Sequence, residues 1–288
     1  MLAQAKPATC RAALEWAARY LNDHNVTMPR LDADLLLAAA LQTERINLYL
    51  EPLRELAEGD WEIFKALVER RGEREPLQYI LGKQEFMTLE LAVSPDVLIP
   101  RADTEVLVEA ALNWAASQSG RLNLLDLCTG SGAIAISLAH FLPQADVWAG
   151  DVSAAALEVA RHNAERCTVN INFALGDLTD PFAGQKFHLI TANPPYIPSR
   201  EIATLQPEVA LREPRLALDG GEDGLDFYRR LAVELPEVLL PGALILLEIG
   251  WDQGESVPKL FHVSGYEDIQ LLKDLGGRDR VLAAVWRR

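Results

Sequence analysis

The sequence has little cysteine and no long apolar run, and each of these absences excludes a class of protein. Its cysteines, Cys10, Cys128 and Cys167, are so widely spaced that they match neither a disulfide framework nor a metal cluster. No apolar run approaches the roughly 20 residues that cross a bilayer, and residues 1–9 lack the charged and apolar regions of a secretion signal. We therefore expect a cytoplasmic protein with free thiols and no membrane partner.

Basic residues are also scarce, with 27 Lys and Arg against 42 Asp and Glu and a formal net charge of -15. Because nucleic-acid binding depends on clustered Lys and Arg that release counterions from phosphates, stable nucleic-acid binding is not expected. The histidines show no ligand spacing, so we also expect no bound metal. We expect the chain to act as a monomer.

Residues 1–75 have apolar positions at helical spacing and predict a small helical bundle. Thr9 is the candidate N-cap of its first helix, Pro29 the first turn of the second, and Asp60 the N-cap of a longer third. A bundle of this size has only a marginal core, so it should dock on a neighbour or on a protein partner. We interpret it as a substrate-recognition domain.

Residues 76–100 change to β-type alternation and predict a β-hairpin linker. One strand would include residues 79–81 and the other residues 86–93, with Gly82 and Lys83 between them. A helix is then predicted to run to about Ser117, with Asp103 as its candidate N-cap. This helix opens the third part of the chain, a predicted catalytic domain over residues 101–288.

Strands and helices alternate from residue 122 onward, which is typical of a doubly wound α/β domain with a largely parallel sheet. The predicted strands are residues 122–127, 146–149, 170–175, 187–192, 243–249, 266–272 and 280–286, and the predicted helices are residues 132–140, 153–166, 225–239 and 253–263. Only residues 273–279 join the last two strands. Because a helical crossover needs more residues than that, the final strand should run antiparallel to its neighbour.

The loop after the first of these strands has the composition of a nucleoside-binding site. It runs from Asp126 to Gly132, and its small residues let backbone amides and a helix N-terminus approach a ligand. Asp151 ends the next strand, where a carboxylate can accept hydrogen bonds from ribose hydroxyls. We expect the adenine edge near the end of the third strand. The predicted cofactor-binding residues here are Cys128, Thr129, Gly130, Ser131, Gly132, Asp151, Asp177 and Leu178.

These features alone fit an NAD-dependent dehydrogenase as well as a methyltransferase, since the loop together with Ala135 also satisfies G-x-G-x-x-A. No residue pattern offers the acid or base of a hydride transfer, however. The predicted antiparallel last strand gives a seven-stranded Rossmann-like sheet that resembles the S-adenosylmethionine-dependent methyltransferase fold. We therefore predict S-adenosyl-L-methionine as the cofactor.

A polar, rigid corner follows the predicted buried strand at residues 187–192. It consists of Asn193, Pro194, Pro195 and Tyr196, which we predict to be the catalytic residues. The Asn193 side-chain oxygen and the Pro194 carbonyl can each accept one hydrogen from a planar NH2 group, and Tyr196 can stack on that group. Such a corner suits an amide or an exocyclic amine as the methyl acceptor, with Asn193 also near the cofactor.

Six segments together resemble one family, the peptide chain release factor N5-glutamine methyltransferases. They are residues 97–105, 126–132, 193–196, 213–221, 224–228 and 247–250. Ala102 stands where the family usually has a second proline, and Cys128 where glycine is common. The resemblance implies that Arg101 contacts the cofactor and that the substrate is the glutamine of the Gly-Gly-Gln motif in class I release factors.

The DNA adenine N6-methyltransferases share the Asn-Pro-Pro-Tyr corner, because adenine also presents a planar NH2 group. A nucleic-acid adenine methyltransferase is therefore an alternative function. The acidic charge and the lack of a second, basic domain stand against it.

Overall fold

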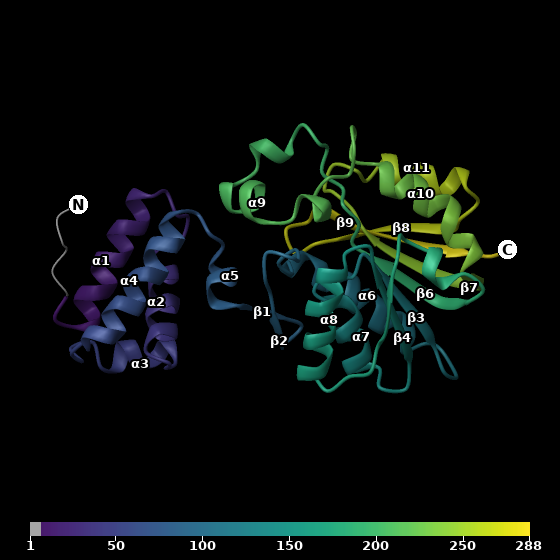
Figure 1. Ribbon diagram of the computed structural model, residues 1–288. Coiled ribbons are helices and arrows are strands. Elements are labelled where there is room, and N and C mark those ends of the chain that lie inside the picture. The colour runs from purple at the N-terminus through teal and green to yellow at the C-terminus, as the bar shows by residue number, and fades with distance from the viewer. Residues whose placement is uncertain (1–6) are drawn as a thin grey trace. The chain divides into compact units, whose positions relative to one another are not determined.

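A computed structural model describes residues 7–288 of the chain (Figure 1). The chain forms two compact units. The helical unit contains the described residues up to Gly82 together with Gln206–Arg212, and the sheet unit contains Lys83–Leu205 and Glu213–Arg288. Among the described residues, no helix is both long enough and apolar enough to cross a membrane.

The helical unit is built from amphipathic helices whose apolar sides meet in one core. Its helices are α1 (Cys10–Asp23), α2 (Pro29–Ala40), α3 (Arg45–Leu50), α4 (Glu58–Gly72), α5 (Leu77–Leu81) and α9 (Pro207–Arg212). The core includes Leu14, Leu36, Trp61 and Phe64, which recur at helical spacing along α1, α2 and α4. The helical prediction for this region is confirmed.

Two of the three predicted helix starts in this unit are confirmed. The Thr9 side chain accepts a hydrogen bond from the backbone N–H of Ala12 at 3.3 Å, and Pro29 occupies the first turn of α2. The prediction that Asp60 caps α4 is wrong, because the N-cap is Ala57 and Asp60 lies inside the first turn. There the carboxylate favours the helix through the macrodipole rather than by capping.

The predicted strand at residues 79–81 is also wrong, since these residues belong to α5. Leu77, Ile80 and Leu81 pack against the core of the helical unit, and Gly82 ends the helix in the left-handed conformation with φ +72°. The hairpin lies further on, between β1 (Lys83–Phe86) and β2 (Leu89–Ala92). Its turn residues both have positive φ, which matches the twist of a tight hairpin.

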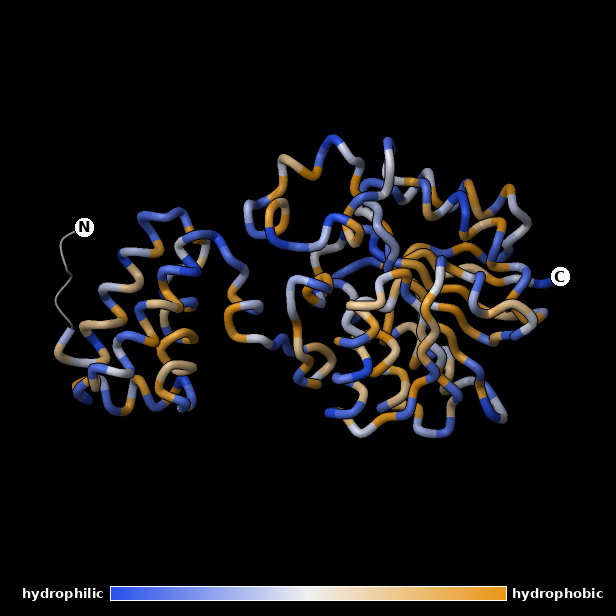
Figure 2. The backbone as a smooth tube through the Cα atoms, in the orientation of Figure 1, coloured by the Kyte–Doolittle hydropathy of each residue, from blue (hydrophilic) through white to orange (hydrophobic). Residues whose placement is uncertain are grey.

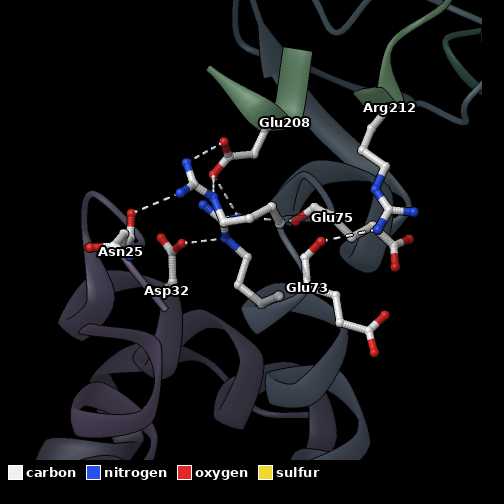
Figure 3. A network of polar contacts seen from close by, with 8 residues as sticks. Asn25, Asp32, Glu73, Glu75, Glu208 and Arg212 are labelled. Atoms are coloured by element: carbon white, nitrogen blue, oxygen red, sulfur yellow. Dashed lines mark hydrogen bonds and ion pairs between the residues drawn. The ribbon is translucent and has the colours of Figure 1, made fainter. Parts of the chain in front are cut away.

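Helix α9 belongs to the helical unit although it lies far along the chain. Its Glu208 carboxylate accepts hydrogen bonds from Arg71 at 2.9 Å and Arg74 at 2.8 Å, and Arg71 also donates to Asp32 at 2.7 Å (Figure 3). Arg212 donates to the backbone carbonyl of Glu73 at 3.0 Å. Buried ion pairs therefore tie residues 206–212 to α2 and α4.

The sheet unit contains the predicted seven-stranded sheet. Its strands are β3 (Asn123–Leu127), β4 (Asp146–Asp151), β5 (Asn172–Leu175), β6 (Phe187–Ala192), β7 (Leu239–Glu248), β8 (Glu267–Lys273) and β9 (Asp279–Trp286). The spatial order is β5-β4-β3-β6-β7-β9-β8, and β9 runs antiparallel to both β7 and β8. The α/β fold class and the antiparallel final strand are confirmed.

Helices cover both faces of this sheet (Figure 1). Helices α6 (Glu105–Ala115), α7 (Ala133–Phe141) and α8 (Ala154–Arg166) share a core with Leu124 and Leu189, whereas α10 (Asp226–Glu234) and α11 (Ser256–Val263) share one with Leu125 and Ile190. Successive strand residues thus point to opposite cores. Because both faces are covered, the central strands are almost continuously hydrophobic (Figure 2).

Several boundary predictions in this unit are wrong, since β7 begins at Leu239 rather than at residue 243 and α11 at Ser256 rather than at residue 253. Asp103 is not an N-cap, because it lies within the 3₁₀ turn Ala102–Thr104 and its carboxylate pairs with Arg280 at 3.2 Å. The helix predicted to reach residue 239 ends at Glu234, since the proline in the next turn, Leu235–Glu237, cannot continue an α-helix and β7 begins at once.

The strand order reverses between β3 and β6. From β3 the chain proceeds outward through β4 and β5, and it then returns to add β6 and β7 on the other side. In open α/β sheets the crevice at such a reversal, at the carboxyl ends of the strands, is where ligands bind. The loop after β3 and the corner after β6 meet at this crevice.

Candidate active site

A cavity lies at this edge of the sheet unit, with an empty volume of about 1040 Å³ that includes open solvent. It is lined by most of the residues predicted from the sequence, namely Arg101, Cys128, Thr129, Gly130, Ser131, Asp151, Asp177, Leu178, Asn193 and Pro195. The other predicted residues, Gly132, Pro194 and Tyr196, are next to lining residues in the sequence but do not line the cavity themselves. The lining also includes Thr104, Pro214 and Phe227, to which the sequence analysis gave no individual role.

The loop after β3 is held in shape by a buried carboxylate. Asp126 accepts hydrogen bonds from the hydroxyls of Thr129 at 2.6 Å and Thr191 at 2.8 Å, which joins this loop to β6. Complete burial raises the pKa of Asp126 to about 7, although both hydroxyl hydrogen bonds act to lower it. Asp126 thus organises the loop from beneath the cavity.

The backbone of the same loop leaves open space for a ligand. Gly130 has φ +54°, and a Cβ added there would meet no atom within 4 Å. Cys128 has φ +55°, a left-handed conformation that favours glycine. Burial raises the pKa of the Cys128 thiol, so this side chain is a neutral wall of the cavity.

Asp151 stands at the end of β4 and faces the loop after β3. Its carboxylate accepts hydrogen bonds from the backbone N–H of Gly130 and of Ser153, both at 2.9 Å. Desolvation raises its pKa despite these hydrogen bonds. Since each carboxylate oxygen has more than one acceptor site, Asp151 can still accept hydrogen bonds from a ligand hydroxyl.

Two further ion pairs frame the cavity. Asp177, after β5, pairs with Arg230 of α10 at 3.0 Å. Glu213 is buried, pairs with Arg101, and accepts a hydrogen bond from the backbone N–H of Ile99 at 3.3 Å. The Arg101 guanidinium is therefore oriented by Glu213, and Glu213 joins the wall at residues 97–101 to the wall that begins at Pro214.

The corner after β6 is packed tightly by a loop that returns to it. A Cβ added to Gly220 would lie 2.8 Å from both the Pro195 carbonyl oxygen and the Tyr196 Cα, so only glycine fits there. The Gly220 backbone N–H donates to the Ile197 carbonyl at 2.9 Å. This close approach gives a physical reason for the glycines between residues 213 and 224.

The polar side chains of the corner lie next to Thr104 and to Glu248, a buried carboxylate at the end of β7. Asn193 donates from Nδ2 to the Thr104 hydroxyl at 3.5 Å, and the Tyr196 hydroxyl lies 3.4 Å from Oε1 of Glu248. Burial raises the pKa of Tyr196, so its hydroxyl stays protonated, and burial raises the pKa of Glu248 to about 7. The sequence analysis gave Glu248 no individual role, and the signal that could have found it is a charged residue directly after an apolar run.

Among residues 7–288, no group of three or more His, Cys, Asp or Glu side chains is arranged to hold a metal ion.

Comparison with known proteins shows which family the chain belongs to. The family model described as the PrmC N-terminal domain matches residues 12–82, and the one described as the methyltransferase small domain matches residues 103–218. A release factor glutamine methyltransferase of Geobacter sulfurreducens is 44% identical over 274 residues, which cover 95% of each chain. The chain belongs to the release factor glutamine methyltransferase family.

A second relative agrees with this family, and a solved structure agrees with the fold. The Moorella thermoacetica release factor glutamine methyltransferase is 45% identical over 282 residues, covering 97% of this chain and 99% of that one. A solved methyltransferase of Pyrococcus furiosus is similar in fold, with a TM-score of 0.52 at 19% identity, covering 70% of this chain and 91% of the other. The family resemblance predicted from the sequence is confirmed. The methyl donor of this family is S-adenosylmethionine. The dehydrogenase and adenine methyltransferase alternatives are not favoured.

Proposed function

We propose that this protein transfers a methyl group from S-adenosylmethionine to the side-chain amide nitrogen, N5, of the glutamine in the Gly-Gly-Gln motif of class I release factors. The observation that carries the proposal is the position of Asn193, which lines the same cavity as Gly130 and Asp151. Two residues suited to binding a nucleoside, Gly130 and Asp151, and one suited to binding a planar NH2 group, Asn193, thus line the same cavity. The names of the relatives support a release factor as the substrate.

The cavity residues fit the methyl donor. We assign the ribose hydroxyls to Asp151, the adenine edge to Asp177 and Leu178, and the open space at Gly130 to the close approach of the ligand to the backbone. Arg101, oriented by Glu213, is assigned a further contact with the donor. Cys128, Thr129, Ser131 and Gly132 shape the loop that carries Gly130.

The chemistry demands position more than basicity. An amide nitrogen is a poor nucleophile because its lone pair is delocalised into the carbonyl. The donor supplies a sulfonium methyl group, whose S–CH3 bond breaks as the N–CH3 bond forms. Fixing both N–H bonds with the Asn193 side-chain oxygen and the Pro194 carbonyl aims the nitrogen at that methyl group, and Tyr196 packs beside it.

Geometric restraint of this kind can contribute several of the ~7–11 kcal/mol that positioning offers. The methylated nitrogen is strongly acidic, so one of its hydrogens leaves to a neighbouring acceptor or to water. The reaction therefore needs no dedicated base. Pro195 completes the stiff backbone of the corner, since two successive prolines fix φ.

We propose three parts for the chain, namely a recognition domain over residues 1–75, a linker over residues 76–100 and the catalytic domain over residues 101–288. A single glutamine offers too little surface for specificity, so the recognition domain should contact the release factor outside the methylated loop. We further propose that the protein acts as a monomer in the cytoplasm. Its charge of -15 disfavours stable nucleic-acid binding.

The test is transfer of a labelled methyl group to two acceptors in parallel, an intact class I release factor and adenine-containing duplex DNA. We expect label on the release factor and none on the DNA. A release factor whose motif glutamine is replaced by alanine is the matched control and should stay unlabelled. Label on DNA alone would replace the proposal with the adenine methyltransferase function.

A further inference from the structure

Glu248 is a buried carboxylate that the proposed chemistry does not use. It ends β7 at 1% exposure, and its Oε2 lies 2.6 Å from the hydroxyl of Thr104, which is 4% exposed. Among the described residues, no basic side chain forms an ion pair with Glu248 within 4.0 Å. The nearby Arg280 pairs instead with Asp103 at 3.2 Å and Asp274 at 3.1 Å. A buried charge held only by hydroxyl groups is costly, so its position calls for a reason.

The direction of the hydrogen bonds supplies one. Above a pH of about 7 Glu248 is ionised and its carboxylate can only accept. A threonine hydroxyl has a single hydrogen, so the Thr104 hydrogen then points to Glu248. Only the lone pairs of Thr104 Oγ1 then remain for Asn193. The Asn193 atom that faces Thr104 must therefore be a donor. In the structure this atom is Nδ2, which lies 3.5 Å from Thr104 Oγ1.

This chain of contacts decides which end of the Asn193 amide a ligand meets. With Nδ2 hydrogen-bonded to Thr104, Oδ1 is the atom of the Asn193 amide that is left to accept a hydrogen bond from a ligand in the cavity that Asn193 lines. The reversed amide would place its oxygen against the lone pairs of Thr104 and present a donor to the substrate NH2. Such a reversed site would repel the group that it has to hold.

We propose that Glu248, acting through Thr104, is a positioning residue that fixes the Asn193 amide with its oxygen free to accept a hydrogen from the substrate NH2. The inference rests on the proposed function. It identifies the residues that make Asn193 present a hydrogen-bond acceptor, rather than a donor, to the substrate amide. Tyr196 is the other hydroxyl beside Glu248, at 3.4 Å, and Tyr228 donates to the Glu248 backbone carbonyl at 2.7 Å. Of the three hydroxyl groups beside Glu248, the one hydrogen-bonded to the Asn193 side chain is that of Thr104, so Thr104 is the link.

The decisive comparison is between Thr104→Val and Thr104→Ser. Valine keeps the shape of threonine but has no lone pair for Nδ2, whereas serine keeps the hydroxyl. We expect kcat on a release factor to fall on the order of 10²-fold in Thr104→Val, the effect of a misplaced reacting group. Thr104→Ser should retain most of the activity, and both should bind the donor as the wild type does. Ser137→Ala, which removes another buried hydroxyl, from α7, is the control and should be fully active.

A second variant tests the carboxylate itself. Glu248→Gln keeps the size but can donate as well as accept, so it no longer dictates the direction of the Thr104 hydrogen, and kcat should fall. Protonation of Glu248 has the same effect in the wild type, whose kcat should decline as the pH falls below about 7. The charged or titratable groups around Glu248 are Tyr196, Tyr228, Asp103 and Arg280. All of them remain in the variant, so the part of the pH profile that disappears in Glu248→Gln belongs to Glu248.

The outcomes separate this inference from the proposed function. The wild-type rate on the release factor tests the function, and the ratio of each variant to the wild type tests the positioning role. Wild-type kcat in both Thr104→Val and Glu248→Gln would overturn the inference while leaving the function intact. Equal losses in Thr104→Val and Thr104→Ser would overturn it too, because the hydroxyl would then not be what matters.

Discussion

Asp151 accepts a hydrogen bond from the backbone N–H of Gly130 at 2.9 Å, which joins the ends of β3 and β4 at the edge of the cavity. This contact holds the open side of Gly130 beside the carboxylate assigned to the ribose. In the proposed function, two adjacent strands present one backbone surface and one side-chain acceptor to the same ligand.

Replacing Asp151 should therefore weaken donor binding. We expect Asp151→Ala to reduce the affinity for S-adenosylmethionine by about 1–3 kcal/mol, the loss typical of a hydrogen bond to a charged group. Calorimetry with the donor and with its demethylated product measures this directly. Asp146→Ala, at the other end of β4, where the side chain contacts Asn172, is the control and should bind as the wild type does. Unchanged affinity in Asp151→Ala would move the ribose contact elsewhere.

The places of the loop at residues 126–132 and of the corner at residues 193–196 could be predicted because they follow from local rules. Residues 187–192 form a strand of the predicted length, and the polar side chain that follows a parallel strand has to lie at the ligand edge. The antiparallel final strand followed from the shortness of residues 273–279 alone. In these cases the signal lies within a dozen residues of the feature.

Contacts between distant segments could not be predicted. Thr104 and Glu248 are separated by 144 residues, and Arg101 and Glu213 by 112, so no periodicity brings them together. The same limit explains the error at residues 79–81, where an apolar run fits either a strand or a helix. These residues form a helix because Ile80 and Leu81 pack against the core of the helical unit.

Removing one partner of the buried ion pairs in the helical unit should be strongly destabilising. Arg71 is 7% exposed and contacts two buried carboxylates, Asp32 and Glu208 (Figure 3). Burial raises the pKa of Asp32, against the lowering effect of Arg71. Burial would also raise the pKa of Glu208, but hydrogen bonds from Arg74 and Arg71 outweigh it and lower that pKa.

Arg71→Ala should therefore destabilise the protein by about 3–5 kcal/mol, because it leaves Asp32 buried without its cation. Denaturant unfolding of the full chain measures the loss. The neighbouring Arg70, whose side chain is 44% exposed, pairs with Glu75, and Arg70→Ala should cost only about 0–1 kcal/mol. Similar losses in the two variants would show that burial of the Arg71 network adds nothing.

The buried Asp126 should give the stability a specific pH dependence. Its pKa is raised from 3.8 to about 7, so between these values the folded chain holds a proton that the unfolded chain has lost. The contribution of Asp126 to stability is therefore largest at low pH and declines as the pH rises toward 7. Measured against Asp126→Asn, the wild type should lose up to about 1.4 kcal/mol of unfolding free energy per pH unit in this window. Parallel profiles for the two proteins would contradict this assignment.

Recognition by the helical unit can be separated from catalysis by comparing two substrates. Leu50 and Leu53 are 70% and 68% exposed, at and just after the end of α3. If this unit contacts the release factor, glutamate at these positions should raise KM for the intact factor and leave KM for a short Gly-Gly-Gln peptide unchanged. The matched control is Val263→Glu on α11 of the sheet unit, 79% exposed, which should alter neither value. Equal KM values for intact factor in the variants and wild type would remove this surface from recognition.

The central claim is that Asn193 positions the amide nitrogen of the substrate. The measurement that tests it most directly is the single-turnover rate of methylation of a class I release factor at saturating donor, with mass spectrometry to locate the methyl group, for the wild type, Asn193→Ala and Asn193→Asp. We expect the wild type to methylate the glutamine of the Gly-Gly-Gln motif. Asn193→Ala should bind the donor but lose on the order of 10²-fold in rate, the effect of removing a preorganised polar contact. Asn193→Asp keeps an acceptor oxygen but adds a charge in a partly buried position. Its rate should therefore lie between the rates of the wild type and Asn193→Ala. A wild-type rate in Asn193→Ala, or a methyl group on any residue other than that glutamine, would contradict the account.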